Sequence, residues 1–205
     1  EEAINAACRR ILEAKYKLGL FDNPYKYCDV KRAKKQIFTK EHRAVARKIA
    51  SESLVLLKNE GNVLPLAKKG TIAVVGPLAD SRSNMPGTWS VAAVLKNATS
   101  LAEGLKAVAG GKAEILTAKG CNLMSDADYK KRATMFGRSL HRDNRSDKEL
   151  LDEALAVAAK SDVIVAALGE SSEMSGESSC RTNLEMTDTQ RILLQELLKT
   201  GKIGR

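Results

Sequence analysis

The side chains best suited to proton transfer gather in one polar segment, residues 169–186, which follows an apolar run at 162–168. The segment is rich in serine and holds four glutamates and one arginine: Glu170, Glu173, Glu177, Glu185 and Arg181. A glutamate placed there can act as a proton donor if a cleft desolvates its carboxyl group and raises the pKa. The same composition suits a solvated acidic loop, so it does not by itself select a catalytic residue.

A second polar segment, residues 76–98, contains the only tryptophan of the chain. Trp89 lies close in sequence to Pro86 and Gly87, which are residues typical of turns. An indole ring in a loop can stack on the face of a sugar ring, and it can equally cover an apolar core. Spacing alone leaves both interpretations open.

Each polar segment follows a run of the kind found in buried parallel strands. Residues 71–75 (TIAVV) are apolar and mostly β-branched, residues 162–168 have the same character, and a third run at 113–117 predicts another strand. Ligands bind at the carboxyl ends of the strands in an open parallel sheet. We therefore expect the loops at 76–98 and 169–186 to be the places where a ligand would bind.

Helices are predicted between these strands. Apolar residues recur at helical spacing over about 4–18, 40–54, 99–109, 147–160 and 188–198. Thr39 is the predicted N-cap of the second helix, and Thr187-Asp188-Thr189-Gln190 has the spacing of a capping box at the start of the last. The alternation of strand and helix predicts an α/β fold with a parallel sheet between helices.

Two segments show no clear period. Residues 23–39 hold Pro24, two tyrosines and a basic cluster, and they are predicted to form a connector. Residues 120–147 are polar and too long for an ordinary connection, which indicates a functional loop or one that contains a short helix.

The charge of the chain is uneven. It has 205 residues and a net charge of +9, and residues 1–50 alone hold 13 Lys and Arg against 6 Asp and Glu. Phosphate binding would use such a patch, and so would a solvated connecting segment. No stacking aromatics, G-x-G-x-x-G fingerprint or P-loop accompany it. We therefore expect no nucleic-acid partner and no nucleotide cofactor.

Membrane and metal signals are also weak. No run of about 18 apolar residues is present, and residues 1–7 lack a basic region before an apolar stretch, so we expect no membrane span and no signal peptide in this chain. The four cysteines, Cys8, Cys28, Cys121 and Cys180, lack metal-binding spacing. We expect free thiols and no metal, and a Cys8–Cys28 bridge stays open.

A family resemblance comes from residues 51–60 (SESLVLLKNE), followed by Leu64-Pro65-Leu66 and the run and turn at 72–77. This string resembles family 3 glycoside hydrolases, in particular bacterial periplasmic β-glucosidases. Residues 15–22 (KYKLGLFD) resemble the last helix of the family's (β/α)8 barrel. Gly76-Pro77-Leu78-Ala79-Asp80, with GTWS at 87–90, resembles the first loop of its α/β sandwich domain.

The resemblance implies a domain plan. Residues 1–22 would be the terminal helix of the N-terminal barrel, 23–39 a linker, and 40–205 an α/β sandwich domain that is incomplete at its C-terminus. The implied fold is a three-layer α/β/α sandwich with a mostly parallel, truncated sheet, preceded by the helix left over from the barrel. The rest of the barrel would lie upstream of Glu1.

The resemblance also implies chemistry. Family members retain configuration by using an aspartate nucleophile from the barrel and a glutamate acid/base from the sandwich domain, about 5–5.5 Å apart. The loop motif of a glutamate, small residues and an arginine matches residues 177–182 (ESSCRT). Glu177 is therefore the implied acid/base, with Glu170 and Glu173 as rivals. Trp89 and Arg181 are the implied substrate contacts, and no metal or cofactor is implied.

The implied function is part of a retaining, exo-acting β-glucosidase that hydrolyses terminal non-reducing β-D-glucosyl residues. Its partners would be a β-glucoside or oligosaccharide substrate and the missing barrel, and the parent protein would be periplasmic or secreted. We expect no hydrolysis by this chain alone, because the nucleophile would lie outside it. The alternative is a non-catalytic α/β module that binds a carbohydrate or a partner, with sugar binding that Trp89→Ala abolishes.

Overall fold

The computed structural model describes residues 1–205 apart from 91, 127–141, 175, 178, 180 and 203–205. The chain divides into two compact units, Glu1–Leu57 and Lys58–Arg205, which are described separately. None of the helices in the described part has the length and apolar character needed to cross a bilayer. Cys8 and Cys28 are exposed free thiols, so the Cys8–Cys28 disulfide that the sequence leaves possible is not formed. Cys121 is a buried free thiol.

The first unit contains the helices α1 (Glu2–Lys17), α2 (Val30–Gln36) and α3 (Lys40–Glu52). Helices α1 and α3 lie where the sequence predicts them, and α1 is followed by Gly19 at a φ of 71°. The predicted cap of α3 is confirmed, because Thr39 Oγ1 accepts a hydrogen bond from His42 N at 3.2 Å. None of the residues of these three helices is buried.

Helix α2 lies inside the segment that the sequence predicts to be a connector. Asp29 caps it, since the Oδ1 atom accepts hydrogen bonds from Lys31 N at 2.9 Å and Arg32 N at 3.2 Å. The helix has seven residues, too few to show the 3.6-residue period on which the sequence prediction depends.

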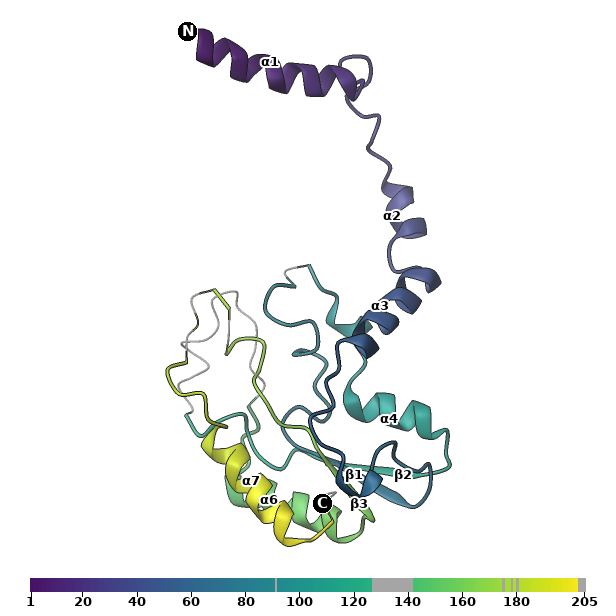
Figure 1. Ribbon diagram of the computed structural model, residues 1–205, viewed down its shortest axis with the longest axis vertical. Coiled ribbons are helices and arrows are strands. Elements are labelled where there is room, and N and C mark those ends of the chain that lie inside the picture. The colour runs from purple at the N-terminus through teal and green to yellow at the C-terminus, as the bar shows by residue number, and fades with distance from the viewer. Residues whose placement is uncertain (91, 127–141, 175, 178, 180, 203–205) are drawn as a thin grey trace. The chain divides into compact units, whose positions relative to one another are not determined.

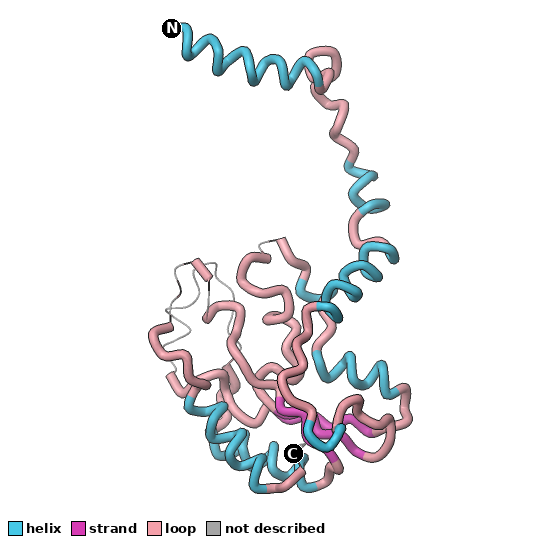
Figure 2. Tube along the Cα trace, in the orientation of Figure 1, coloured by secondary structure: helices cyan, strands magenta, loops and turns pink. Residues whose placement is uncertain are grey.

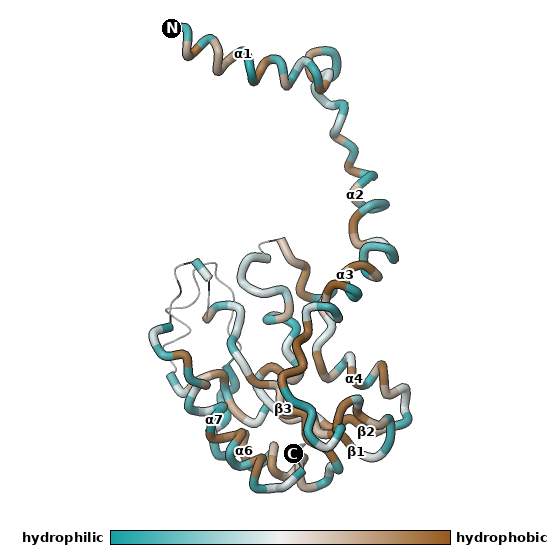
Figure 3. Tube along the Cα trace, viewed as in Figure 1, coloured by the Kyte–Doolittle hydropathy of each residue, from teal (hydrophilic) through white to brown (hydrophobic). Residues whose placement is uncertain are grey.

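The second unit is built on a parallel sheet. Its strands are β1 (Thr71–Val75), β2 (Glu114–Ala118) and β3 (Val163–Ala166), in the order β2-β1-β3. Thr71 pairs with Glu114, and Ile72 pairs with Val163. Figure 2 shows the strands in magenta, and β1 is brown in Figure 3 because its side chains are apolar. All three strands lie within one or two residues of their predicted bounds.

Helices cover both faces of this sheet. They are α4 (Leu101–Ala109), α6 (Asp147–Ala159) and α7 (Asp188–Lys199), with short 3-10 turns at Glu60–Asn62 and Leu95–Asn97. One face of the sheet packs on α6 and α7, around a core of Ala73, Val75, Ala154, Ala158, Leu193 and Leu197. The other face packs on α4, around Ile72, Val74, Ala102 and Ala109. Because side chains alternate along β1, the two faces give the predicted α/β/α layers (Figure 1).

The helices described in the second unit start differently. Helices α4 and α6 begin with capping boxes, formed by Ser100 with Glu103 and by Ser146 with Glu149. The capping box predicted for α7 is wrong, because Thr187 makes no side-chain hydrogen bond to its own helix. Its hydroxyl group donates instead to the Leu123 carbonyl oxygen at 2.6 Å.

Candidate functional site

A cavity of about 840 Å³ opens at the carboxyl edge of the sheet. Its wall contains residues that follow all three strands: Gly76 and Pro77 after β1, Lys119 after β2, and Ser172 and Glu173 after β3. Its charged lining residues are Asp80, Arg82, Lys96, Glu103, Lys119, Arg145, Glu153 and Glu173. This is the edge at which parallel sheets bind ligands.

Gly76 brings the loop after β1 against the end of β3. Its φ is +130°, and a Cβ atom there would lie 2.3 Å from the Ala167 carbonyl oxygen. That oxygen accepts a hydrogen bond from Leu78 N at 3.3 Å. Only glycine fits this position, so the loops after β1 and β3 begin side by side.

The same two loops meet again further out. Ser172 N donates to the Asn84 side-chain oxygen at 2.9 Å. A Cβ atom on Gly176 would lie 2.5 Å from Cγ2 of Thr88, so the backbone of one loop rests on the side chain of the other. Since Glu177 follows Gly176 and Trp89 follows Thr88, the structure places these two predicted site residues on contacting segments.

An arginine and a carboxylate are paired in the cavity wall next to α4. Arg82 Nε donates to Glu103 Oε2 at 3.0 Å, and its Nη2 pairs with Oε1 of the same carboxylate. Hydrogen bonding from Arg82 and from the Ser100 backbone lowers the pKa of Glu103 to about 2. Nearby, Ser100 Oγ donates to Asp80 Oδ1 at 2.5 Å.

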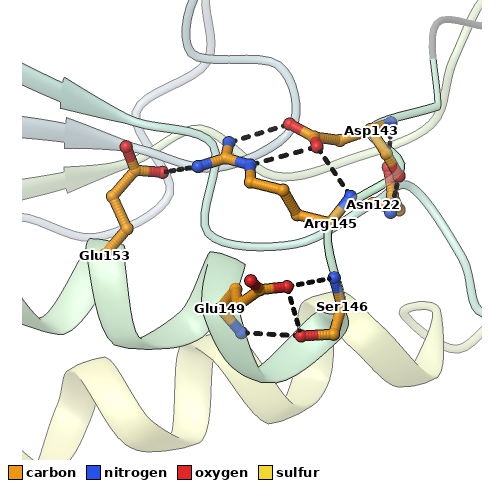
Figure 4. A network of polar contacts seen from close by, with 6 residues as sticks. All are labelled: Asn122, Asp143, Arg145, Ser146, Glu149 and Glu153. Carbon is orange, nitrogen blue, oxygen red and sulfur yellow. Dashed lines mark hydrogen bonds and ion pairs between the residues drawn. The ribbon is translucent and has the colours of Figure 1, made fainter.

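Figure 4 shows a second polar network, and two of its members, Arg145 and Glu153, line the cavity. Arg145 donates from Nε and Nη2 to the Asp143 carboxylate at 3.1 and 2.8 Å, and from Nη1 to Glu153 at 2.9 Å. These hydrogen bonds hold the pKa of Asp143 well below its ordinary value. The Asn122 side chain binds the backbone N–H and carbonyl of Asp143. The segment before α6 is therefore tied both to that helix and to the residues after β2.

Lys119 supplies a half-buried cation to the cavity. Burial lowers the pKa of its ammonium group, and the nearby Asp143 carboxylate opposes this change. Since the two arginines of the wall are matched by carboxylates, the cavity presents balanced charge rather than a field of one sign. Such a wall offers many hydrogen-bonding groups to a polar ligand.

Glu170 and Arg181 hold the loop after β3 together. Glu170 is exposed, and its carboxylate forms an ion pair with Nη1 of Arg181. The Nη2 atom of the same guanidinium donates to the Glu185 carbonyl oxygen at 2.7 Å. In this structure Arg181 therefore links the two halves of the loop.

The other predicted site residues differ in exposure. Glu173 lines the cavity and is only 5% exposed, and its carbonyl oxygen accepts a hydrogen bond from Ser179 Oγ at 3.0 Å. Glu177 is exposed in a turn that is closed by a hydrogen bond from Ser179 N to the Gly176 carbonyl oxygen at 3.2 Å. Trp89 is 70% exposed. Two motif residues, 178 and 180, lie outside the described residues.

Residues 54–203 match the family model described as the glycosyl hydrolase family 3 C-terminal domain. The chain belongs to glycosyl hydrolase family 3. The family 3 resemblance found in the sequence is thereby confirmed, and with it the α/β fold.

Relatives of this family 3 chain include named glycosidases. It is 41% identical to the periplasmic beta-glucosidase of Salmonella typhimurium over 97% of this chain and 26% of the relative. It is 34% identical to a beta-xylosidase of Formosa agariphila, over 97% of this chain and 25% of the relative. The chain thus spans about a quarter of the length of these relatives.

A solved structure of a β-glucosidase also matches this chain. The crystal structure of a beta-glucosidase from Listeria innocua in complex with gluconolactone matches with a TM-score of 0.72 and 31% identity. The match covers 95% of this chain and 23% of that one. Among the described residues of the family 3 chain, no group of three or more His, Cys, Asp or Glu side chains is arranged to hold a metal ion.

Sequence reasoning missed several residues that hold the loops at this edge of the sheet. Asn84, Arg145 and Gln190 each join segments that are distant in sequence, and no local pattern marks such contacts. For Gln190 a signal exists, because the Thr-x-x-Gln spacing singles it out, yet the pattern predicts a bond within the helix.

Proposed function

We propose that the whole protein to which this chain belongs is a retaining, exo-acting β-glucosidase, and that Glu177 is its acid/base residue. One observation carries the choice of residue. Glu177 is exposed in a turn of the loop at the carboxyl edge of the sheet. By contrast, Glu170 is paired with Arg181, and Glu173 is 5% exposed.

The proposed chemistry divides between two carboxyl groups. Glu177 donates a proton to the glycosidic oxygen while an aspartate from another part of the whole protein attacks the anomeric carbon. Glu177 then takes a proton from the water molecule that hydrolyses the glycosyl-enzyme intermediate. This chain supplies only the acid/base, so we propose that it is inactive alone.

Trp89 and Arg181 are proposed to help bind the substrate. The exposed indole of Trp89 lies on the segment that contacts the turn of Glu177, where it can stack on the leaving group. Arg181 keeps the loop folded through Glu170 and Glu185 and is close in sequence to Glu177.

The sugar, the location and the domain plan are part of the proposal. Names of relatives include both β-glucosidase and β-xylosidase, and the 41% identical relative favours a terminal β-D-glucosyl residue and a periplasmic protein. We propose residues 1–22 as the last helix of a barrel, 23–39 as a linker and 40–205 as sandwich domain.

The test compares glutamate variants in the whole protein. Glu177→Ala should lower kcat on an aryl β-glucoside with a poor leaving group by about 10²- to 10⁴-fold, because general acid–base catalysis contributes that much. On a 2,4-dinitrophenyl β-glucoside, whose leaving group needs no acid, breakdown of the glycosyl-enzyme becomes the slow step, so azide should restore part of the turnover there and give a β-glucosyl azide. Glu170→Ala and Glu173→Ala are the matched variants. An unchanged rate in Glu177→Ala, with a large loss in one of the others, would move the role to that residue.

A further inference from the structure

Gln190 is a buried carboxamide at the third position of α7, and it contacts the loop that carries Glu177. It is 1% exposed. Its Oε1 atom accepts a hydrogen bond from Gly169 N at 2.8 Å, and its Nε2 atom donates to the Gly169 carbonyl oxygen at 2.8 Å. Nε2 also donates to the Leu123 carbonyl oxygen at 3.1 Å. Both N–H groups and the carbonyl oxygen of the amide are therefore used.

Gly169 is the residue at which the chain leaves β3 and enters the loop. Its φ is +147°, which glycine adopts readily, and a Cβ atom there would lie 3.4 Å from Cδ1 of Leu78. The two hydrogen bonds between the Gln190 side chain and the Gly169 backbone, one in each direction, resemble the paired N–H and C=O contacts between neighbouring strands. They fix both the position and the direction in which the loop departs.

The far end of the loop is held at the same place. Thr187 Oγ1 donates to the Leu123 carbonyl oxygen at 2.6 Å, so this one oxygen accepts from both Thr187 and Gln190. Thr189 Oγ1 donates to the neighbouring Asn122 carbonyl oxygen at 2.8 Å. We call Gln190, Gly169, Leu123 and Thr187 the stem clamp, because together they close the base of the loop on the segment after β2.

Fixed points continue from the stem clamp towards Glu177. Ser172 N is held by Asn84, and Ser179 Oγ binds the Glu173 carbonyl oxygen. The loop is thus anchored at several points, and Glu177 lies between the anchors at Gly169 and Thr187, so the stem clamp limits where Glu177 can lie. In enzymes a displacement of about 1 Å can cost about 100-fold in rate.

We propose that Gln190 is a positioning residue for the Glu177 carboxyl group. The proposal rests on the proposed function of Glu177. Gln190 does not touch the substrate; it sets where the loop begins and ends, and so where the acid/base lies relative to the glycosidic oxygen.

The test uses Gln190→Met in the whole protein, with two aryl β-glucosides. A 2,4-dinitrophenyl leaving group departs without protonation, whereas an unsubstituted phenol needs the acid. We expect kcat/KM to fall up to about 100-fold more on the phenyl glucoside than on the dinitrophenyl glucoside. The ratio of the two values does not depend on how much of the variant is folded. An unchanged ratio overturns the proposal.

Two further variants sharpen this test. Gln195→Met makes the same substitution at an exposed position of α7 and should leave the ratio unchanged. Gln190→Glu keeps an acceptor for the Gly169 N–H but has no donor when ionised and only one when protonated, so it should change the ratio in the same direction as Gln190→Met.

The positioning role and the function of Glu177 can fail separately. If the ratio of kcat/KM on the two glucosides is unchanged in Gln190→Met but changes strongly in Glu177→Ala, only the positioning role is overturned. A flat ratio in Glu177→Ala overturns both. Hydrogen exchange on the 205-residue chain tests the stem clamp itself. Gln190→Met should speed exchange of the Gly169 amide, and unchanged protection there counts against the clamp.

Discussion

Helices α6 and α7 begin with the same spacing of side chains, Ser146-x-x-Glu149 and Thr187-x-x-Gln190, and use it differently. Ser146 and Glu149 bind each other's backbone N–H groups, so all of these hydrogen bonds stay in the first turn of α6 (Figure 4). The side chains of Thr187 and Gln190 form hydrogen bonds with the backbone of Leu123 and Gly169, outside α7. The same local pattern therefore caps the first turn of α6, whereas at α7 it holds the segments that contain Leu123 and Gly169.

Burial explains the difference. Glu149 is exposed, where a carboxylate is well solvated and can bind its own helix end. Gln190 is buried next to peptide groups that need partners, and a carboxamide supplies both donors and an acceptor there. A carboxylate in its place would meet the two carbonyl oxygens with no proton to donate. In this chain the exposed Glu149 therefore caps its own helix, and the buried Gln190 holds the neighbouring loops.

The largest effect should come from removing the clamp. We expect Gln190→Ala to lower the free energy of unfolding of the chain by about 3 kcal/mol, because it leaves three hydrogen bonds unmade and opens a cavity. Ser146→Ala should cost about 1 kcal/mol, the usual effect of losing an N-cap. Urea denaturation followed by circular dichroism measures both. Equal losses in the two variants would contradict the contrast between α6 and α7.

An intermediate effect should appear in thiol labelling. Burial raises the pKa of the Cys121 thiol to about 12, so at pH 8 this cysteine reacts only when its segment opens. It precedes Asn122 and Leu123, which the start of α7 holds. Gln190→Met should speed labelling of Cys121 about tenfold or more, since about 1.4 kcal/mol of opening energy corresponds to tenfold.

Mass spectrometry of the Cys121 peptide follows this reaction, and the exposed Cys8 and Cys28 serve as fast internal references. Gln195→Met is the matched control. A Cys121 rate that is equal in Gln190→Met and in the unmodified chain would show that the clamp does not restrain this segment.

The smallest effect concerns acid. Hydrogen bonds from the Ser146 side chain and backbone lower the pKa of Glu149 below its ordinary value of 4.5. Its contribution to stability is therefore present above about pH 4.5 and is lost as the pH falls through the lower, folded-state pKa. Gln190 does not titrate, so the clamp should persist. Glu149→Gln should be less stable than the unmodified chain at pH 7, and the gap should narrow below pH 4.5 in urea titrations.

Much of the fold was predictable because its signals are local. The apolar, β-branched run of β1 and the glycine after it specify a buried strand, and Thr39 specifies the start of α3. Helix α2 was missed because seven residues show no period, although Asp29 marks its start. The α/β class followed from the order of the elements.

The site was less predictable because it is assembled from distant segments. The sequence singled out Glu177 and Trp89, but nothing local indicates that Gly176 rests on Thr88 or that Ser172 binds Asn84. The Thr-x-x-Gln spacing marks Gln190 but predicts a hydrogen bond within its own helix. In the folded chain the side chain is buried and binds Gly169 and Leu123 instead, and the local sequence does not show that burial.

The order of the strands in the sheet has a consequence for synthesis. β1 lies in the middle and is made first, and Thr71 at its start is 43 residues from its partner Glu114 and 91 residues from its partner Asp162. At about 5–20 residues per second, the ribosome needs roughly 5 to 18 s to produce the second of these partners. Until β2 is made both edges of this buried apolar strand are unpaired, and until β3 is made one of them still is. We therefore expect the nascent chain to be exposed to aggregation through β1 during that time.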